Sequence, residues 1–214
     1  MSKRAPVIAT SSFKKIKTPE LLLIALNDHL KLNDFKPVLG EPTWDPEYLV
    51  YNKAGIYSLD TRDVQLKECL ITPAIQDLAY QLLTPEVEKW AGIPIVRSWG
   101  YGIREYTNSC RLAVHRDRKE SHVLSCIVHV DDDSTEPWPL DFVDHKGEHH
   151  EVYMKVGDTL LYESLCPHGR VNPFNGVYYR NTYFHWKPEN WDHSVMDGVT
   201  VKYASLEHAI KDMS

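Results

Sequence analysis

Residues 122–130 read HVLSCIVHV, and apolar side chains alternate with others along them. Side chains at alternate positions of an extended chain point to the same side. One side of this segment therefore carries Leu124, Cys126, Val128 and Val130. Because alternation with a period of two is typical of a half-buried strand, the segment predicts a β-strand with one face in a core.

The alternating pattern begins near residue 93 and continues through most of the remaining chain. It predicts strands at residues 95–107, 122–130, 138–143, 151–156, 158–163 and 176–187, with a short one near 199–203. The consecutive acids Asp131, Asp132 and Asp133 predict a turn that ends the second strand. This part of the chain is therefore expected to form a β-sandwich or β-barrel.

Helix signals occupy the first third. Thr18-Pro19-Glu20 supplies a capping hydroxyl, a proline at the first helical position and an acid at the positive end of the helix dipole. Leucines at helical spacing follow and predict a helix at 19–32. The same opening at Thr72-Pro73 and at Thr84-Pro85 predicts a second helix and a short third one. A closing helix is expected at 205–213.

The order of these elements predicts one domain of the α+β class, mainly β, with N-terminal helices packed against a sheet. Its predicted parts are a flexible basic tail at 1–17 and a single domain at 18–214. Within the domain we expect helical support at 18–92, a β core at 93–188 and a C-terminal extension at 189–214.

Composition excludes several classes of function. The 214 residues carry a formal net charge of −6, which argues against a nucleic-acid-binding protein. No apolar run reaches the roughly 20 residues that cross a bilayer, so no membrane association is expected. Four scattered cysteines without a CxxC pair suit a reducing compartment. We therefore expect a cytoplasmic protein.

The triplet His115-Arg116-Asp117 is the first candidate for chemistry. On an extended segment, residues two apart project to the same side, so His115 and Asp117 can reach one metal ion. His168 follows within Cys166-Pro167-His168-Gly169-Arg170. Two imidazoles and one carboxylate on one face of an octahedral ion form the triad of non-haem Fe(II) oxygenases, and they leave open positions for other ligands. We therefore predict a metal site at His115, Asp117 and His168.

A second candidate lies on the last long strand. Arg180 and Thr182 share one face there, and a guanidinium with a neighbouring hydroxyl suits a carboxylate. The alternative for Arg180 is an outward-facing position on an edge strand. Its spacing from His168 favours the ligand interpretation.

Residues 95–188 resemble the double-stranded β-helix (jelly-roll) core of 2-oxoglutarate- and Fe(II)-dependent oxygenases, and within them the prolyl 4-hydroxylase-like branch. The matching segments cover under half of the chain and follow the family's order. They are Arg104-Glu105-Tyr106, Leu112 with His115-Arg116-Asp117, Gly157-Asp158-Thr159-Leu160-Leu161-Tyr162, Pro167-His168-Gly169-Arg170, Gly176, and Arg180-Asn181-Thr182-Tyr183-Phe184-His185-Trp186.

This resemblance implies an enzyme that binds Fe(II), 2-oxoglutarate and dioxygen, with ascorbate a candidate further cofactor. It would hydroxylate an unactivated C–H bond and release succinate and CO2. The substrate would be a prolyl residue of a peptide or protein, or a small molecule. Tyr106 would donate its hydroxyl to 2-oxoglutarate, and Arg180 would pair with the distal carboxylate. Arg170, two residues after His168, is the alternative candidate for that contact.

One alternative function stays open. A cupin-type metal-binding jelly-roll, acting as an isomerase, sensor or binding module, would need no carboxylate-binding arginine.

The segment 131–153 is rich in charge and histidine and is expected to form a loop near the site that governs substrate choice. The histidines within it, His145, His149 and His150, are more simply part of a solvated turn than a second metal site.

Overall fold

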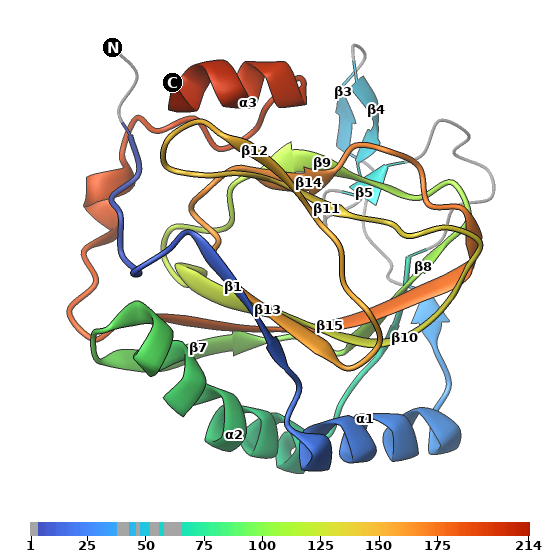
Figure 1. Ribbon diagram of the computed structural model, residues 1–214. Coiled ribbons are helices and arrows are strands. Elements are labelled where there is room, and N and C mark those ends of the chain that lie inside the picture. Colours follow the sequence, from blue (N-terminus) through green and yellow to red (C-terminus); the bar gives the residue numbers. More distant parts are fainter. Residues whose placement is uncertain (1–3, 38–42, 46–47, 52–55, 58–65) are drawn as a thin grey trace.

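The computed structural model of the protein describes residues 4–37, 43–45, 48–51, 56–57 and 66–214. Two antiparallel sheets lie face to face, with two helices beneath one sheet and a third helix over the other (Figure 1). This is the double-stranded β-helix, or jelly-roll, that the strand pattern and the resemblance predicted. No helix among the described residues is both long enough and apolar enough to cross a bilayer.

The larger sheet takes its strands from both ends of the chain. In the described part of the chain their order is β1-β13-β10-β15-β8-β6-β2, and β7 pairs with β15. Their bounds are β1 Phe13–Lys17, β2 Lys36–Pro37, β6 Lys67–Cys69, β7 Ile95–Gly100, β8 Ile103–Thr107, β10 Leu124–Ser134, β13 Asp158–Glu163 and β15 Gly176–Pro188.

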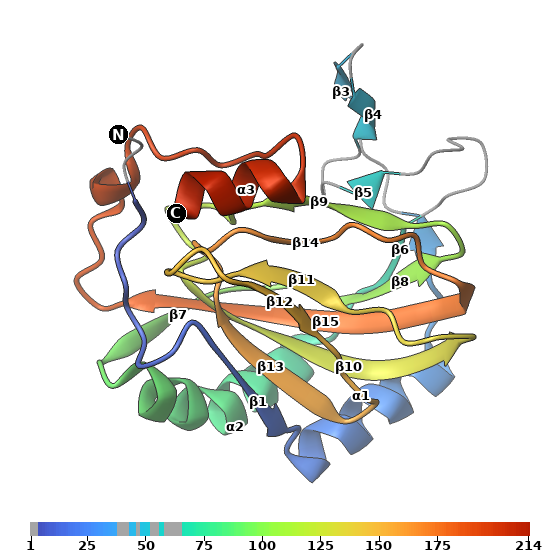
Figure 2. The ribbon, with the colours of Figure 1, turned by 45° about the horizontal axis from the view of Figure 1, so that its top comes forward.

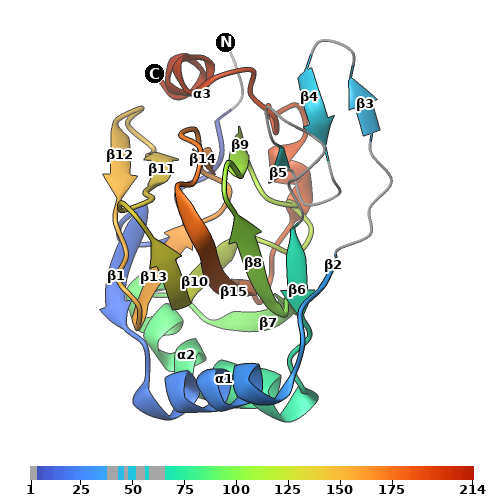
Figure 3. The same cartoon turned by 90° about the vertical axis from the view of Figure 1, so that its right-hand side faces the viewer.

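The smaller sheet has the order β12-β11-β14-β9-β5 and lies above the larger one (Figure 2). Its strands are β5 Ile56–Tyr57, β9 Arg111–His115, β11 Leu140–Val143, β12 His149–Val152 and β14 His168–Arg170. A separate hairpin joins β3 Thr43–Asp45 to β4 Tyr48–Tyr51, and it stands at one end of the molecule (Figure 3).

The helices pack on the outer faces of the sheets. They are α1 Glu20–Leu32, α2 Pro73–Ala91 and α3 Leu206–Met213, with a 3-10 turn η1 at His193–Met196. One apolar core lies between α1, α2 and the larger sheet, and includes Leu26, Trp90 and Trp186. A second core lies between the two sheets and under α3, and includes Phe142 and Met213. The cavity described below opens within this second layer.

Most predicted elements are present, with shifted bounds. The helices at 19–32 and 205–213 are confirmed as α1 and α3. The two helices expected from Thr72-Pro73 and Thr84-Pro85 form the single helix α2, which contains Pro85. Pro85 removes one backbone hydrogen bond, but Val87 and Trp90 beyond it are buried, so packing keeps the helix continuous. No strand forms at 199–203, where a single bridge joins Lys202 to His115.

Residues 1–17 are not a flexible tail throughout. Residues 13–17 form β1, which pairs along its whole length with β13. Just before it, the backbone N–H groups of Ile8 and Ala9 donate to the buried carboxylate of Glu163, at 3.1 and 2.9 Å. Lys15 and Lys17 alternate with the half-buried Ile16 and are exposed, a strand pattern that their charge concealed in the sequence. The predicted helical support at 18–92 likewise includes strands, β2 and β6, that extend the larger sheet.

The segment 131–153 also differs from the loop predicted for it. Strand β10 continues through the three acids to Ser134, with a register shift between His129 and Asp131. Strands β11 and β12 then pair as a hairpin of the smaller sheet. Among the described residues of this segment, only Leu140 lines the cavity.

Candidate metal centre and adjoining cavity

The three predicted metal ligands come together on the smaller sheet. His115 ends β9, Asp117 follows two residues later, and His168 begins β14. His168 lies directly opposite His115 in the antiparallel register, and side chains of such a pair project to the same face. The two imidazole rings are accordingly 4.5 Å apart, centroid to centroid.

Each imidazole presents the same nitrogen to the carboxylate. Nε2 of His115 lies 3.4 Å and Nε2 of His168 lies 3.8 Å from Oδ1 of Asp117. The other ring nitrogen of each histidine points to a backbone carbonyl, Ala113 O at 2.7 Å and Cys166 O at 2.9 Å. A carbonyl only accepts, so Nδ1 donates in both rings and the Nε2 lone pairs converge.

This donor set fits a divalent metal ion. The other carboxylate oxygen of Asp117, Oδ2, is buried and has no hydrogen-bond partner among the described residues. A buried unpaired carboxylate oxygen is costly, and a cation between the three ligand atoms would remove that cost. Two neutral imidazoles and one carboxylate are also the ligands that Fe(II) takes in a facial triad.

The surroundings favour the metal-binding protonation states of His168 and Asp117. Burial lowers the pKa of His168 to about 4, and the neighbouring His115 contributes in the same direction. Burial opposes ionisation of Asp117, but its hydrogen bond to His115 and the charges of the nearby histidines outweigh burial and hold its pKa well below the usual range. At neutral pH Asp117 is therefore an anion and His168 a neutral ligand.

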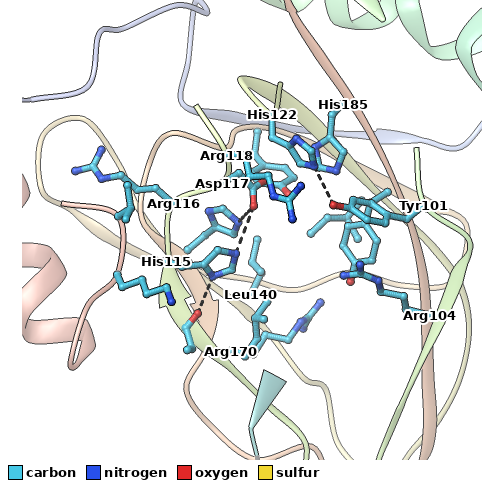
Figure 4. Close-up of a pocket in the computed structure, with 18 of the residues that line it drawn as sticks. Tyr101, Arg104, His115, Arg116, Asp117, Arg118, His122, Leu140, Arg170 and His185 are labelled. Atoms are coloured by element: carbon cyan, nitrogen blue, oxygen red, sulfur yellow. Dashed lines mark hydrogen bonds and ion pairs between the residues drawn. The ribbon is translucent and has the colours of Figure 1, made fainter. Parts of the chain in front are cut away.

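The triad forms one wall of a cavity of about 560 Å³ (Figure 4), a size that holds a small-molecule ligand. Both sheets line it. The smaller sheet and the turn after β9 contribute Leu112, Ala113, His115, Asp117, Leu140, His168 and Arg170, and the larger sheet contributes Arg104, Tyr106, Ile127, Tyr162, Tyr183 and His185.

Arg170 lies in the cavity with donors to spare. It is only 2% exposed, and its guanidinium stacks over the rings of Trp138 and Tyr179, at 4.4 and 4.8 Å from their centroids. Nη1 donates to the Trp138 carbonyl. Nη2 is buried without a hydrogen-bond partner among the described residues. A buried guanidinium with an unused donor is suited to an incoming carboxylate.

Tyr106 lies in the same cavity, as the sequence analysis expected. Its hydroxyl and that of Tyr183 share a hydrogen bond of 2.6 Å. Burial raises the pKa of Tyr106 well above its usual value, so the hydroxyl keeps its proton and can donate it in a hydrogen bond.

Arg180 and Thr182 do not line the cavity. On β15 their neighbours of the same parity, Phe184 and Trp186, pack against the helices, whereas Tyr183 and His185 face the cavity. Arg180 is neutralised on the outer face by Glu105 at 2.7 Å and Asp131 at 2.9 Å. The hydroxyl of Thr182 donates to the carbonyl of Tyr101. The sequence prediction placed Arg180 and Thr182 at the co-substrate site. Both residues instead lie on the face of β15 that points away from the cavity.

A polar wall that the sequence analysis missed completes the cavity. The rings of His122 and His185 lie 3.8 Å apart, and the Tyr101 hydroxyl is 3.0 Å from Nε2 of His122. Burial lowers the pKa of both histidines, that of His185 furthest. The alternation of β15 carried the signal, because once Phe184 and Trp186 are placed in the core, His185 must face the other way.

Asp144, Glu148 and His150 form a second group with metal-ligand atoms close together. Asp144 and Glu148 lie on the turn between β11 and β12 and His150 lies in β12; Oδ1 of Asp144 accepts the N–H groups of Lys146 and Glu148, both at 2.9 Å. The Asp144 carboxylate thus closes this turn, whereas His149 and His150, expected in a solvated turn, belong to a strand.

The fold is that of the 2-oxoglutarate- and Fe(II)-dependent oxygenases. The similar structures include HygX from Streptomyces hygroscopicus with nickel, 2-oxoglutarate and hygromycin B bound, at 15% identity, a TM-score of 0.56 and coverage of 92% of this chain and 95% of that one. They also include a Pseudomonas putida prolyl-4-hydroxylase, at 14% identity, a TM-score of 0.54 and coverage of 82% and 93%.

A third similar structure is a prolyl hydroxylase from Trichoplax adhaerens in complex with a hypoxia-inducible-factor peptide. It is 10% identical, with a TM-score of 0.55 and coverage of 83% of this chain and 84% of that one. No family model matches the sequence, and no curated protein matches it.

Proposed function

We propose that the protein is an Fe(II)- and 2-oxoglutarate-dependent dioxygenase that hydroxylates a C–H bond. One observation carries the proposal. A converging His-Asp-His set with an unpaired carboxylate oxygen shares a cavity with a buried arginine that has no acidic partner among the described residues. The His-Asp-His set would bind the metal cation. The buried arginine would pair with the distal carboxylate of 2-oxoglutarate, a dianion.

The ligand residues hold the metal, and the metal supplies the activation of dioxygen when it is bound. His115 and His168 contribute Nε2, because their Nδ1–H groups are already used by backbone carbonyls. Asp117 contributes its carboxylate. With only three protein ligands, the ion would remain open to a co-substrate and to dioxygen.

Arg170 takes the role that the sequence analysis first gave to Arg180. Its unused Nη2 donor would pair with the distal carboxylate of 2-oxoglutarate, and Tyr106 would donate its hydroxyl to the same molecule. Apolar side chains of Leu112, Ile127 and Leu140 line the cavity with them and exclude water. The reaction consumes R–H, O2 and 2-oxoglutarate and yields R–OH, succinate and CO2.

The substrate class has two candidates. A prolyl residue of a peptide is one, because two of the similar structures are prolyl hydroxylases. A small molecule is the other, because HygX was solved with hygromycin B. The charges around the cavity favour the second candidate, as argued below.

The test is co-substrate turnover without a prime substrate. Purified protein is mixed with Fe(II), ascorbate and 2-oxoglutarate, and succinate is measured. We expect slow succinate formation that requires His115, Asp117 and His168. A metal-binding jelly-roll of the cupin type would bind the ion and form no succinate, so that result would reject the proposal.

Metal binding itself is a separate prediction. His168→Ala and Asp117→Ala should each lose the single equivalent of Ni(II) that the wild type binds, measured by calorimetry. His150→Ala is the matched control, because it removes a histidine from the other cluster of potential ligands. If His150→Ala loses the ion and His168→Ala retains it, the metal site has been assigned to the wrong cluster.

A further inference from the structure

Two residues that line the cavity keep a buried, unpartnered polar atom after the metal and 2-oxoglutarate have been assigned. These atoms are Nε of Arg104 and Nε2 of His185. Both residues line the cavity and both come from the larger sheet. The residues assigned to the metal and to the distal carboxylate, in contrast, lie on the smaller sheet or in the turn that follows β9.

A chain of hydrogen bonds fixes which proton His185 carries. The Ser164 hydroxyl donates to the carbonyl of His122 at 3.0 Å and so accepts from the Ser125 hydroxyl at 2.6 Å. Ser125 has then used its only proton, and its oxygen must accept from Nδ1 of His185, 2.5 Å away. Nε2 of His185 therefore carries a lone pair and is an unused hydrogen-bond acceptor.

Arg104 provides a positive charge and a hydrogen-bond donor, in contrast to the acceptor of His185. Its guanidinium stacks on the Tyr101 ring, 4.2 Å from the centroid, and the same ring lies 5.5 Å from that of His185. Glu68 forms a long ion pair with it, 4.0 Å from Nε, and already accepts the N–H of Gly102. The Nε–H donor of Arg104 is therefore unused.

The remaining charges around the cavity are mostly positive. Arg118, whose side chain points toward the cavity in Figure 4, and Lys202 also line it, and Asp117 and Glu120 are the acids among the lining residues. Arg116 points away and is paired with Asp212. Because the whole chain carries a net charge of −6, this concentration of cations is local, and it attracts anions to the cavity.

We propose that the prime substrate is a small hydroxylated anion whose carboxylate or phosphate pairs with Arg104 and whose hydroxyl donates to Nε2 of His185. This inference rests on the proposed dioxygenase function and names the substrate class of that site. An ammonium group would also donate to His185, but Arg104 and Arg118 repel it. A neutral polyol could accept a hydrogen bond from Nε of Arg104, but it would bring no negative charge to the cations that line the cavity. An anion with a hydroxyl satisfies both unpartnered atoms and also meets this positive charge.

The experiment compares matched compounds on the wild-type protein loaded with Ni(II) and 2-oxoglutarate. D-gluconate, D-glycerate and glycerol 3-phosphate represent hydroxylated anions. Glucitol and glycerol lack the charge, hexanoate and propionate lack the hydroxyls, and glucosamine reverses the charge. We expect the tightest binding, measured by calorimetry, from a hydroxylated anion, about 10- to 100-fold tighter than its neutral and deoxy partners, because an unpaired buried polar group costs about 1–3 kcal/mol.

Two variants then connect the preference to its residues. Arg104→Gln should bind the hydroxylated anion no better than its neutral partner. His185→Phe should no longer distinguish the hydroxylated acid from the deoxy acid, and His185→Gln, which keeps an acceptor, should restore part of the distinction. Arg97→Gln is the matched control, because Arg97 is an exposed arginine that pairs with Asp77.

The outcomes separate this inference from the proposed function. A wild type that binds neither Ni(II) nor 2-oxoglutarate contradicts the dioxygenase proposal itself. A wild type that binds both, but prefers a neutral or cationic compound or binds no hydroxylated anion at millimolar concentration, contradicts only the substrate class. Equal loss of binding in Arg97→Gln and Arg104→Gln would also overturn the inference.

Discussion

Arg170 and Arg180 lie on consecutive strands and have opposite electrostatic surroundings. Arg180 is held by two carboxylates on the outer face of the larger sheet. Arg170 stacks between two rings inside the barrel, and no ion pair to an acid is found for it among the described residues. An arginine that already pairs with carboxylates contributes little free energy to the binding of another anion. A buried arginine without an acidic partner contributes much more.

We therefore predict that Arg170→Gln raises the dissociation constant for 2-oxoglutarate by about 100-fold or more, in line with the ~3–5 kcal/mol cost of a buried ion pair that loses one member. Ni(II) binding should stay within about threefold, since Arg170 is not a ligand. Calorimetry on the Ni(II)-loaded protein measures both. Arg180→Gln serves as the comparison, and a larger loss there than in Arg170→Gln would return the carboxylate contact to the residue first predicted.

The convergence of His115, Asp117 and His168 was predictable from the sequence, and the arginine that we propose for the carboxylate contact was not. His115 and Asp117 are two residues apart, so their common face follows from the backbone alone, and His168 stood out by its neighbours. The position of an arginine depends on which face of β15 is inside. That face is set by the 171–175 connection and by the register shift of β10 at His129, which spacing from His168 does not encode.

Strand β1 shows how an element can be hidden by its composition. Lys14, Lys15 and Lys17 suggested a solvated tail, yet the strand pairs with β13, and Lys17 reaches Asp158 at 2.6 Å. Burial opposes ionisation of Asp158, but the Lys17 contact, the Lys155 N–H and the charge of Lys15 outweigh it and lower the pKa of Asp158. A charged edge strand is also a common defence against unwanted pairing.

The lowered pKa gives a prediction at the scale of this element. A carboxyl whose pKa is lower in the folded state stabilises the fold above its unfolded pKa of about 3.9, and the contribution is lost as the pH falls through the lower folded value. Asp158→Asn should therefore reduce the free energy of unfolding at pH 7 by about 1–2 kcal/mol, a range that allows for the exposure of Lys17.

The difference should shrink as the pH falls below about 3.9 and be lost below the lowered pKa of the folded protein. Urea unfolding of wild type and Asp158→Asn at pH 7 and near pH 3 measures it, with Asp77→Asn as a control at an exposed ion pair. A difference of the same size at both pH values would show that Asp158 acts by packing and not through its charge.

At the scale of the whole molecule, the cavity joins two layers. The metal ligands and Arg170 come from the smaller sheet and the turn after β9, while Tyr106, Tyr183, Arg104 and His185 come from the larger one. The overall arrangement of helices and sheets could be predicted because periodicity changes near residue 93. Which cavity residues come from the smaller sheet and which from the larger one could not be predicted, because that depends on which strands pair with one another.

Ligands that contact both layers should stabilise the folded protein. At 100 times its dissociation constant a ligand adds about 2.7 kcal/mol, which for a domain of this size raises the melting temperature by roughly 5–10 °C. We expect Ni(II) alone to raise it, and Ni(II) with 2-oxoglutarate to raise it further. Differential scanning calorimetry tests this, and the increase should be absent in Asp117→Ala. An undiminished increase in that variant would mean that the ion binds elsewhere.

The pairing of β14 with β9 has one more consequence. Strand β14 has only three residues, and His168 lies opposite His115. A slip of one residue would turn every side chain of β14 to the other side of the sheet and would remove both His168 and Arg170 from the cavity. An ion held by His115, Asp117 and His168 would therefore bind only when these two strands are aligned as observed, and its binding would stabilise that alignment over a shifted one.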